Sequence, residues 1–207
     1  MANKLYGIGV GVGDSGLVTL KAVKILKEVD YICTPLSAKS DSSRALEIIS
    51  SLVDLKDRVV KLEFKMSKNK QDPFLYSTYS YMLENIKRWD NSIKFETVPG
   101  INSIAAVTSE YNLPLAEGKE NTAILSDLKD EEHLEKVFNL FETVVILKLS
   151  RNFDTAYRVL EKLGLKSSVL IASKCGFEDE FYTKNIEIFK SRKIEYLTLM
   201  IVKRKGI

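Results

Sequence analysis

Short apolar runs alternate with helix-like patterns through the first third of the chain. Such runs predict buried strands, and apolar residues at three- and four-residue spacing between them predict amphipathic helices. The predicted strands are Leu5–Val12, Tyr31–Thr34, which Pro35 ends, and Val59–Phe64; the predicted helices are Leu17–Lys27 and a segment from Ser42 or Ser43 to Leu52. This alternation favours right-handed crossovers and a parallel sheet.

The pattern continues to the end of the chain, with one interruption rich in Pro and Gly, "NLPLAEGKEN". Before it we expect a Tyr-rich helix, "YSTYSYMLENIKRW", a strand, "KFETV", and a helix over Ser103–Tyr111. After it we expect the strands "TAILSDL", "TVVILKLS", "SVLIASKC" and "YLTLMIVKR", with helices over Glu131–Phe141 and in "FDTAYRVLEKLG", which Gly164 closes. The sequence therefore predicts two α/β domains, residues 1–115 and 116–207.

One junction is too short for this architecture. Between the third strand and Pro73 the chain has only a few polar residues, "SKNKQD". Parallel strands need crossover connections of about a dozen residues or more. A helix and a strand that we would expect here are missing after residue 70.

Composition and charge exclude several functional classes. The 207 residues carry a formal net charge of only +3, which is too low for a dedicated nucleic-acid-binding protein. No apolar run approaches the roughly 18 to 20 residues that a membrane-spanning helix requires, and the start "MANKLYGIG" lacks the apolar core of a signal peptide. The two cysteines, Cys33 and Cys175, form neither a metal-ligand spacing nor a disulfide framework. We expect a cytoplasmic protein without a metal site.

The first predicted strand ends in the glycine-rich stretch "YGIGVGVGDSG". A dinucleotide-binding fingerprint would need an acidic residue about 20 positions later, at the end of the second strand. That region reads "YICTPLSAK", and the nearest acids, Glu28 and Asp30, precede the strand. Two interpretations of the glycines remain: a tight structural turn, or a place where a ligand approaches the bare backbone.

Four stretches in order, "GVGVGD", "DPFLYSTY", "TVPGINS" and "NLPLAEG", resemble the motifs of the tetrapyrrole methylases. That family uses S-adenosylmethionine to methylate corrin and sirohaem precursors. The resemblance covers nearly the whole chain and is greatest to members that act at C-20 of precorrin-2 or cobalt-precorrin-2. It implies an N-terminal parallel sheet, a C-terminal mixed sheet, a cleft between the two domains, and a homodimer.

The resemblance also implies which residues contact the cofactor and the substrate. Gly9–Asp14 matches the first family motif, with Val12 in the usual proline position, and Gln71–Pro73 matches the Gly-Asp-Pro loop. The implied cofactor contacts are Gly11, Val12, Asp72, Pro73, Leu75, Ser77, Thr78, Asn102, Ser103, Leu147 and Gly176. The implied substrate contacts are Gly13, Asp14, Tyr76 and Lys148.

Gln71 departs from the family pattern, which has glycine there, and it lies at the short junction. Family members carry roughly 30 more residues at this point. Either the natural protein has a segment that this sequence lacks, or the protein has lost a central strand and cofactor binding is in doubt. We favour the first alternative, because a sheet without an internal strand would leave backbone groups unpaired.

The remaining polar residues do not indicate another chemistry. His133, the single histidine, lies in the polar stretch "KDEEHLEK", and we expect it at the surface. Glu178, Asp179 and Glu180 form an acidic turn that we also expect to be solvated. No Ser-His-Asp, Cys-His or paired-carboxylate arrangement is recognisable, so hydrolysis has no support. No catalytic acid or base is identified.

Overall fold

The computed structural model describes residues 4–36, 43–63, 86–88 and 90–207. By packing, the chain divides into two compact units, Met1–Ile101 and Asn102–Ile207. Helix α4 therefore belongs to the second unit, where its Val107 is fully buried in an apolar cluster. The domain boundary predicted between residues 115 and 116 lies within the Pro- and Gly-rich stretch, and it stays a prediction.

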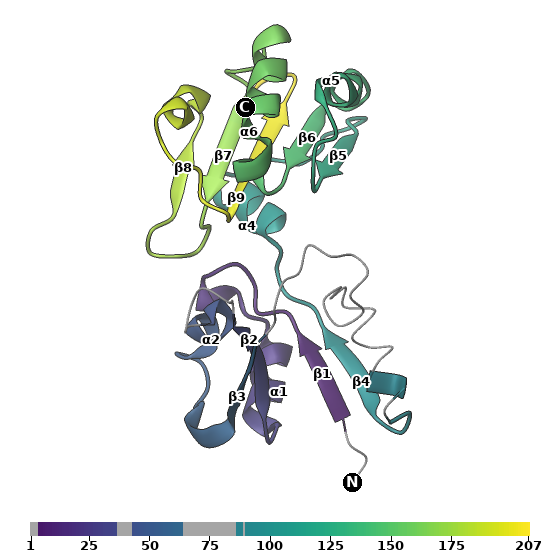
Figure 1. The fold of residues 1–207 in the computed structure, drawn as a ribbon, viewed down its shortest axis with the longest axis vertical. Coiled ribbons are helices and arrows are strands. Elements are labelled where there is room, and N and C mark those ends of the chain that lie inside the picture. Colours follow the sequence, from purple (N-terminus) through teal and green to yellow (C-terminus); the bar gives the residue numbers. More distant parts are fainter. Residues whose placement is uncertain (1–3, 37–42, 64–85, 89) are drawn as a thin grey trace. The chain divides into compact units, whose positions relative to one another are not determined.

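The first unit contains two pairs of parallel strands (Figure 1). Strand β1 (Lys4–Ile8) pairs with β4 (Lys94–Val98), and β2 (Ile32–Leu36) pairs with β3 (Val59–Glu63). The helical segments are η1 (Ser15–Leu17), α1 (Leu20–Glu28), α2 (Arg44–Ile49) and η2 (Lys56–Arg58). The strands are parallel as predicted, but among the described residues they form two pairs rather than one sheet.

Helix α1 contacts both strand pairs. Thr19 caps its start by accepting a hydrogen bond from the Ala22 N–H at 3.2 Å. Lys21 Nζ lies 2.6 Å from a carboxylate oxygen of Glu96 on β4. At the other end of the helix, Arg58, next to β3, donates from Nη1 to the Val29 carbonyl at 2.9 Å. One helix therefore ties the two strand pairs of this unit together.

The second unit is a five-stranded mixed sheet with the strand order β5-β6-β9-β7-β8. Its elements are α4 (Ser103–Glu110), β5 (Thr122–Leu125), α5 (Glu131–Leu140), β6 (Thr143–Ile146), α6 (Leu149–Lys162), β7 (Val169–Ser173), β8 (Phe181–Thr183), η3 (Ile186–Lys190) and β9 (Thr198–Lys203). β5 and β6 are parallel, whereas β9 runs antiparallel to β6 and β7. The mixed sheet expected from the family resemblance is confirmed.

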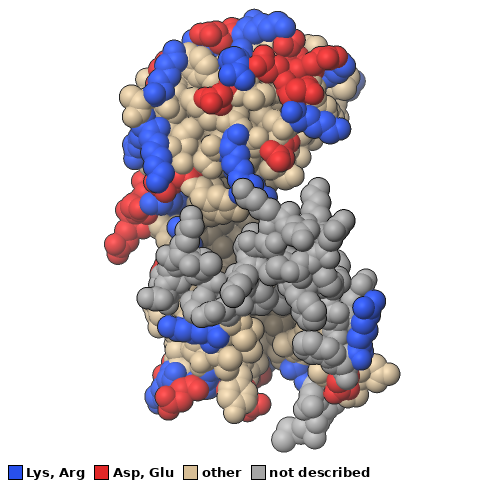
Figure 2. Space-filling model, in the orientation of Figure 1, with Lys and Arg blue, Asp and Glu red and all other residues tan. Residues whose placement is uncertain are grey.

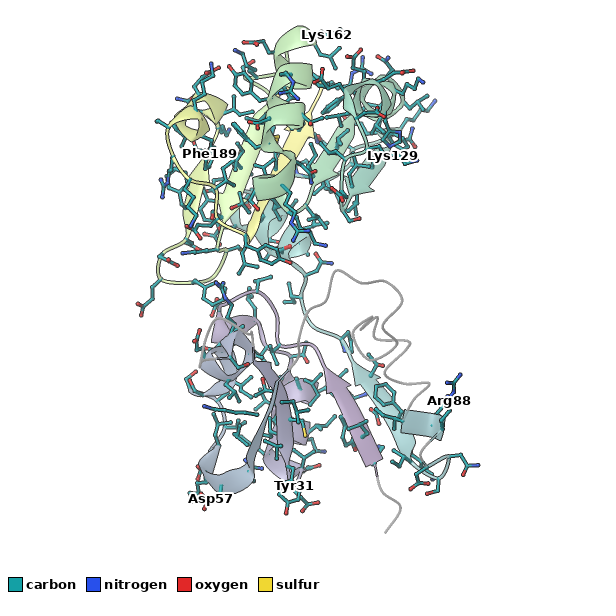
Figure 3. All side chains as sticks on the ribbon, in the orientation of Figure 1. Tyr31, Asp57, Arg88, Lys129, Lys162 and Phe189 are labelled. Atoms are coloured by element: carbon teal, nitrogen blue, oxygen red, sulfur yellow. The ribbon has the colours of Figure 1, made fainter. Side chains whose placement is uncertain are left out.

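The central strands β6, β9 and β7 are buried on both faces of this sheet, and successive side chains of each strand point to opposite faces. One face packs against α5 and α6. Phe189 of η3, labelled in Figure 3, belongs to the same apolar cluster and makes an edge contact with Phe153, with ring centroids 5.9 Å apart. The other face packs against α4. The central strands supply both clusters in alternation: Ile171 of β7 belongs to the first, and Leu170 to the second.

Most predicted elements are present, and "KFETV" forms a strand over its full length. Several predicted bounds are wrong, and three of them have a clear physical reason. β1 ends at Ile8 instead of Val12, because the glycine-rich turn begins there. β2 runs through Pro35, which a strand tolerates where its N–H is not needed for pairing. β6 ends at Ile146, because Lys148 has a left-handed φ of 53° that starts α6. The Tyr-rich helix lies largely outside the described residues.

Candidate functional site

Two glycines from different loops meet where β1 and β4 end. The strands are parallel, so both loops leave the same edge of the pair. Gly9 N–H still donates to the Val98 carbonyl at 2.9 Å. A Cβ atom on Gly9 would lie 2.7 Å from the nitrogen of Gly100, and one on Gly100 would lie 2.6 Å from the oxygen of Gly9. The first and third predicted motifs therefore touch, backbone against backbone.

Beyond this contact, the first loop has a conformation that requires glycine. Gly11 has a φ of 88° and Gly13 a φ of 135°, values that side-chain-bearing residues rarely adopt. Asp14 then begins η1, and one of its carboxylate oxygens accepts the Gly16 N–H at 2.7 Å. Gly11 and Gly13 thus leave the backbone on both sides of Val12 without a side chain, which fits a loop that a cofactor approaches closely.

The third motif leads directly into a helix. Asn102 is the N-cap of α4, and its Oδ1 accepts the Ala105 N–H at 2.9 Å. Ser103 is the first residue of the helix and is half-buried. Free N–H groups and the helix dipole make such a turn a good partner for a polar or anionic ligand group.

In the second unit, Leu147, Lys148 and Gly176 follow β6 and β7. Both strands are antiparallel to β9 and so share a direction, which places their carboxyl ends at one edge of the sheet. Leu147 and Cys175 pack against the same apolar cluster as α4. The structure therefore brings the start of α4, Leu147 and the Cys175–Gly176 turn to one face of this sheet.

The Gly176 turn is held by a contact that sequence reasoning missed. Glu180 is exposed, as expected for the acidic turn, but its Oε2 accepts the Gly176 N–H at 2.8 Å. Beside it, Tyr182 donates to Cys175 Sγ at 3.3 Å and packs on Tyr111 with ring centroids 4.5 Å apart. Burial raises the pKa of the Tyr182 hydroxyl above its ordinary value. The Gly176 N–H is therefore already used by a hydrogen bond within the turn.

The "NLPLAEG" motif is anchored by a lysine at the end of β9. Lys203, whose side chain is 5% exposed, donates from Nζ to the Pro114 carbonyl at 2.8 Å. The same nitrogen lies 3.3 Å from Glu120, also 5% exposed, and 3.4 Å from Glu117. The buried cation thus fixes the loop by one backbone and two carboxylate contacts.

Several predicted residues lie outside the described part of the chain. They are Gln71, Asp72, Pro73, Leu75, Tyr76, Ser77 and Thr78. Their roles, and the contacts assigned to the described site residues, stay predictions. His133 is half-buried on α5, rather than fully at the surface. The described residues include no group of three or more side chains suited to a metal ion, and no helix long and apolar enough to cross a membrane.

The two loops that require glycine and the capped helix α4 occur in the order of the sequence motifs. A comparison with known protein families shows to which family the chain belongs. The family model described as Tetrapyrrole (Corrin/Porphyrin) Methylases matches residues 4–71 and 72–187. The chain belongs to this family. The tetrapyrrole methylase is 36% identical to the probable cobalt-precorrin-2 C(20)-methyltransferase of Methanocaldococcus jannaschii, over 99% of this chain and 97% of that protein. It is 24% identical to the cobalt-precorrin-2 C(20)-methyltransferase of Salmonella typhimurium, over 99% and 98%.

Solved structures confirm the fold of this tetrapyrrole methylase. The cobalt precorrin-4 methyltransferase structure superposes with a TM-score of 0.71 at 18% identity, covering 97% of this chain and 94% of that one. A uroporphyrin-III C-methyltransferase from Thermus thermophilus, complexed with S-adenosylhomocysteine, gives a TM-score of 0.59 at 18% identity, covering 97% of each chain. The predicted α/β fold class is confirmed.

The comparisons also bear on the short junction after residue 70. The family match breaks between the adjacent residues Gln71 and Asp72. The alignment with the M. jannaschii protein runs over 232 positions and includes 99% of the 207 residues of this chain. That relative therefore carries residues for which this methylase has no counterpart. The segment expected after residue 70 stays a prediction.

Proposed function

We propose that this tetrapyrrole methylase transfers a methyl group from S-adenosylmethionine to C-20 of cobalt-precorrin-2 or precorrin-2, in cobalamin biosynthesis. The observation that carries this proposal is the 36% identity to the M. jannaschii protein along almost the full length of both chains. The S. typhimurium protein, whose name states the same reaction, supports it independently.

The described site residues fit an S-adenosylmethionine cofactor. Gly11 has a left-handed φ, and Gly9 and Gly100 bring their loops into backbone contact, so these three positions present backbone without a side chain. We assign cofactor contacts to Gly11, Val12, Asn102, Ser103, Leu147 and Gly176, with Asp72, Pro73, Leu75, Ser77 and Thr78 completing the set. A fold neighbour was solved with S-adenosylhomocysteine, the product of methyl donation.

The protein's task in this reaction is positional. The bound cofactor supplies a methyl group on a positively charged sulfur. As the bond from C-20 to the methyl carbon formed and the sulfur–methyl bond broke, the sulfur would become neutral and C-20 would release its proton to solvent, so the leaving group needs no acid. Holding carbon, methyl and sulfur in line accounts for the rate enhancement through effective molarity. The loops at Gly11 and Asn102 hold the donor, and Gly13, Asp14, Tyr76 and Lys148 orient the macrocycle.

Lys148 has a specific part in this account. Its side chain is exposed, and its backbone lies two residues after a strand whose four residues are all buried. The substrate carries acetate and propionate carboxylates, and an ammonium group is a suitable partner for one of them.

The test is methyl transfer measured by mass spectrometry, with purified protein, S-adenosylmethionine, and either precorrin-2 or cobalt-precorrin-2. The proposal predicts a gain of one methyl group on at least one of these substrates. Methylation of a different precorrin, with neither of these two accepted, would support the nearest alternative, a same-family enzyme with another substrate.

The short junction at residues 70 and 71, if the natural protein has it, favours a second candidate, a non-catalytic binding module. Calorimetry with S-adenosylhomocysteine separates the two. The enzyme proposal predicts binding, and a folded chain that binds neither this ligand nor S-adenosylmethionine contradicts it. We also propose a homodimer that works in the cytoplasm, as the family resemblance implies; light scattering on the purified protein tests the dimer.

A further inference from the structure

The turn that joins β7 to β8, residues 174–180, is held by several backbone hydrogen bonds. Lys174 N–H donates to the Leu197 carbonyl at 2.9 Å, which ties the start of the turn to the chain before β9. Phe177 N–H donates to the Lys174 carbonyl at 3.0 Å, and Glu180 N–H donates to the Phe177 carbonyl, also at 3.0 Å. These bonds follow the whole turn, so its path is fixed from one strand to the next.

Two residues of the turn have left-handed backbone conformations. The φ of Lys174 is 53° and that of Gly176 is 79°. Such a φ costs free energy at a residue with a side chain, and it persists where the surrounding contacts impose it. Lys174 Nζ also pairs with the carboxylate of Asp179 inside the turn. The contacts of the turn therefore hold a conformation that an isolated loop would rarely adopt.

Glu180 adds the one side-chain contact to the Gly176 backbone that the structure describes. Its Oε2 accepts the Gly176 N–H at 2.8 Å, and the Tyr182 hydroxyl lies 3.4 Å from the same oxygen. Residues 178–180 are all acidic and exposed. Acidic side chains gather at the lower left of the second unit in Figure 2, where Figure 1 draws this turn. Among these carboxylates, Glu180 is the one that closes the turn on itself.

Tyr182 connects the turn to helix α4. Its hydroxyl lies 3.3 Å from Cys175 Sγ, and its ring packs on Tyr111 with the ring planes inclined at 46°. Tyr111 directly follows α4, and Val107 of this helix is buried in the cluster against which Cys175 packs. Asn102 caps the other end of the same helix. The turn and α4, which both carry assigned cofactor contacts, therefore belong to one packed cluster.

We propose that Glu180 is a positioning residue, which holds the turn through the Gly176 N–H in the conformation that receives S-adenosylmethionine. The inference rests on the proposed function, because it requires that Gly176 contacts the cofactor. A loop that is ordered before its ligand arrives avoids the entropy that a mobile loop loses on binding. Glu180 acts through the backbone of Gly176 and does not itself contact the cofactor.

The test is calorimetry with S-adenosylhomocysteine on the full chain and on three variants. Glu180→Ala removes the acceptor and should weaken the affinity by about threefold to tenfold, the usual effect of one hydrogen bond. Glu180→Gln keeps a side-chain oxygen that can accept the Gly176 N–H, and its affinity should stay within about twofold of that of the unchanged protein. Glu178→Ala is the matched control, because it removes one exposed negative charge from the same turn.

Three results would overturn the inference. The first is an unchanged affinity in Glu180→Ala. The second is a Glu180→Gln protein that binds as weakly as Glu180→Ala, because the charge and not the hydrogen bond would then matter. The third is an equal loss of affinity in Glu178→Ala, which would show that any carboxylate of the turn has the same effect.

Amide hydrogen exchange in the ligand-free proteins measures the positioning step by itself. The Gly176 amide should exchange about threefold faster or more in Glu180→Ala, and the Glu180→Gln protein should regain the slower rate. The amide of Ile171, in the buried strand β7, is the internal reference. A general loss of stability would speed exchange at both amides, whereas loss of the positioning contact speeds it at Gly176 alone. An unchanged Gly176 rate in Glu180→Ala would overturn the inference.

The two measurements also separate this inference from the proposed function. An unchanged protein that binds no S-adenosylhomocysteine would contradict both, even if Glu180 protects the Gly176 amide. An unchanged protein that binds this ligand, with the same affinity as Glu180→Ala, would contradict the inference alone and leave the proposed function in place.

Discussion

Gly9 and Gly100 approach each other so closely that neither position has room for a side chain. The hypothetical Cβ of Gly100 falls 2.6 Å from Gly9 O and 3.1 Å from Gly11 N. Residues more than ninety positions apart thus form one surface of bare backbone where two parallel strands end. This contact joins two of the four motifs that carry the family resemblance.

Replacing Gly100 by Ala should damage both stability and cofactor binding. The added methyl meets backbone atoms, which cannot move aside as a flexible side chain can. We expect the free energy of unfolding to fall by at least about 2 kcal/mol, and the affinity for S-adenosylhomocysteine to weaken. Chemical denaturation and calorimetry measure the two effects.

Gly16→Ala is the matched control, because its Cβ would meet only the Asp14 carboxylate, at 3.1 Å, and a side chain can shift. A Gly100→Ala protein with the stability and ligand affinity of the unchanged chain would show that the two loops do not need this contact.

Asn102 combines a structural role, which the structure describes, with a predicted cofactor contact. Asn102→Ala removes the cap of α4 and should cost about 1 kcal/mol of stability. Asn102→Asp keeps an equally good cap but removes the side-chain N–H donors. If the Asn102 amide contacts the cofactor, Asn102→Asp has the stability of the unchanged protein but binds S-adenosylhomocysteine as weakly as Asn102→Ala does. Full affinity in Asn102→Asp would mean that this residue only caps the helix.

Lys148 is strained for a residue with a side chain, since its φ is 53°. Lys148→Gly relieves this strain and should stabilise the protein by roughly 1 kcal/mol. Loss of the ammonium group should at the same time raise the KM for the tetrapyrrole. Lys148→Ala is the control, because it removes the charge without relieving the strain. A KM that neither substitution changes would exclude Lys148 from substrate binding.

The ion pairs of Glu187 predict that the free energy of unfolding depends on pH. Lys166, at 2.9 Å, lowers the pKa of this carboxyl most, followed by Lys190 and Tyr157, and together they bring it from 4.5 to about 2. A carboxyl with a depressed folded-state pKa stabilises the protein above its unfolded pKa and loses that contribution as pH falls through the folded value. Glu187→Gln should therefore lower Tm slightly at neutral pH, because solvent screens this partly exposed network, and the difference should shrink between pH 4.5 and pH 2.

The control for this pH dependence is Glu132→Gln. Glu132 pairs with Lys136 on α5, with side chains 78% and 68% exposed, and such pairs contribute little. A Glu187→Gln protein whose Tm difference stays constant across this pH range would contradict the proposed network.

The strands were predictable because their patterns are local. The strand "KFETV" and the apolar runs of the second unit have the length and composition of strands. Capping residues such as Asp130 mark where helices start. The end of β6 was not predictable. "VVILKLS" continues the apolar run, and nothing in the residue type shows that Lys148 adopts a left-handed conformation.

The motifs of the candidate site could be recognised in the sequence, but the contacts between them could not. A glycine indicates that backbone is exposed or crowded, yet it does not indicate which distant backbone approaches, so the Gly9–Gly100 contact could only come from the fold. The Glu180–Gly176 hydrogen bond was missed for a similar reason. It depends on the path of a turn, and the sequence "FEDE" does not determine which carboxylate faces inward.

The most direct test of the central claim is the position of the transferred carbon. The protein is incubated with cobalt-precorrin-2 or precorrin-2 and S-adenosylmethionine labelled with ¹³C at its methyl group, and the product is analysed by NMR. The account predicts a single labelled methyl bonded to C-20. A label bonded to any other ring carbon, or no label in product from protein that binds S-adenosylhomocysteine, would contradict it.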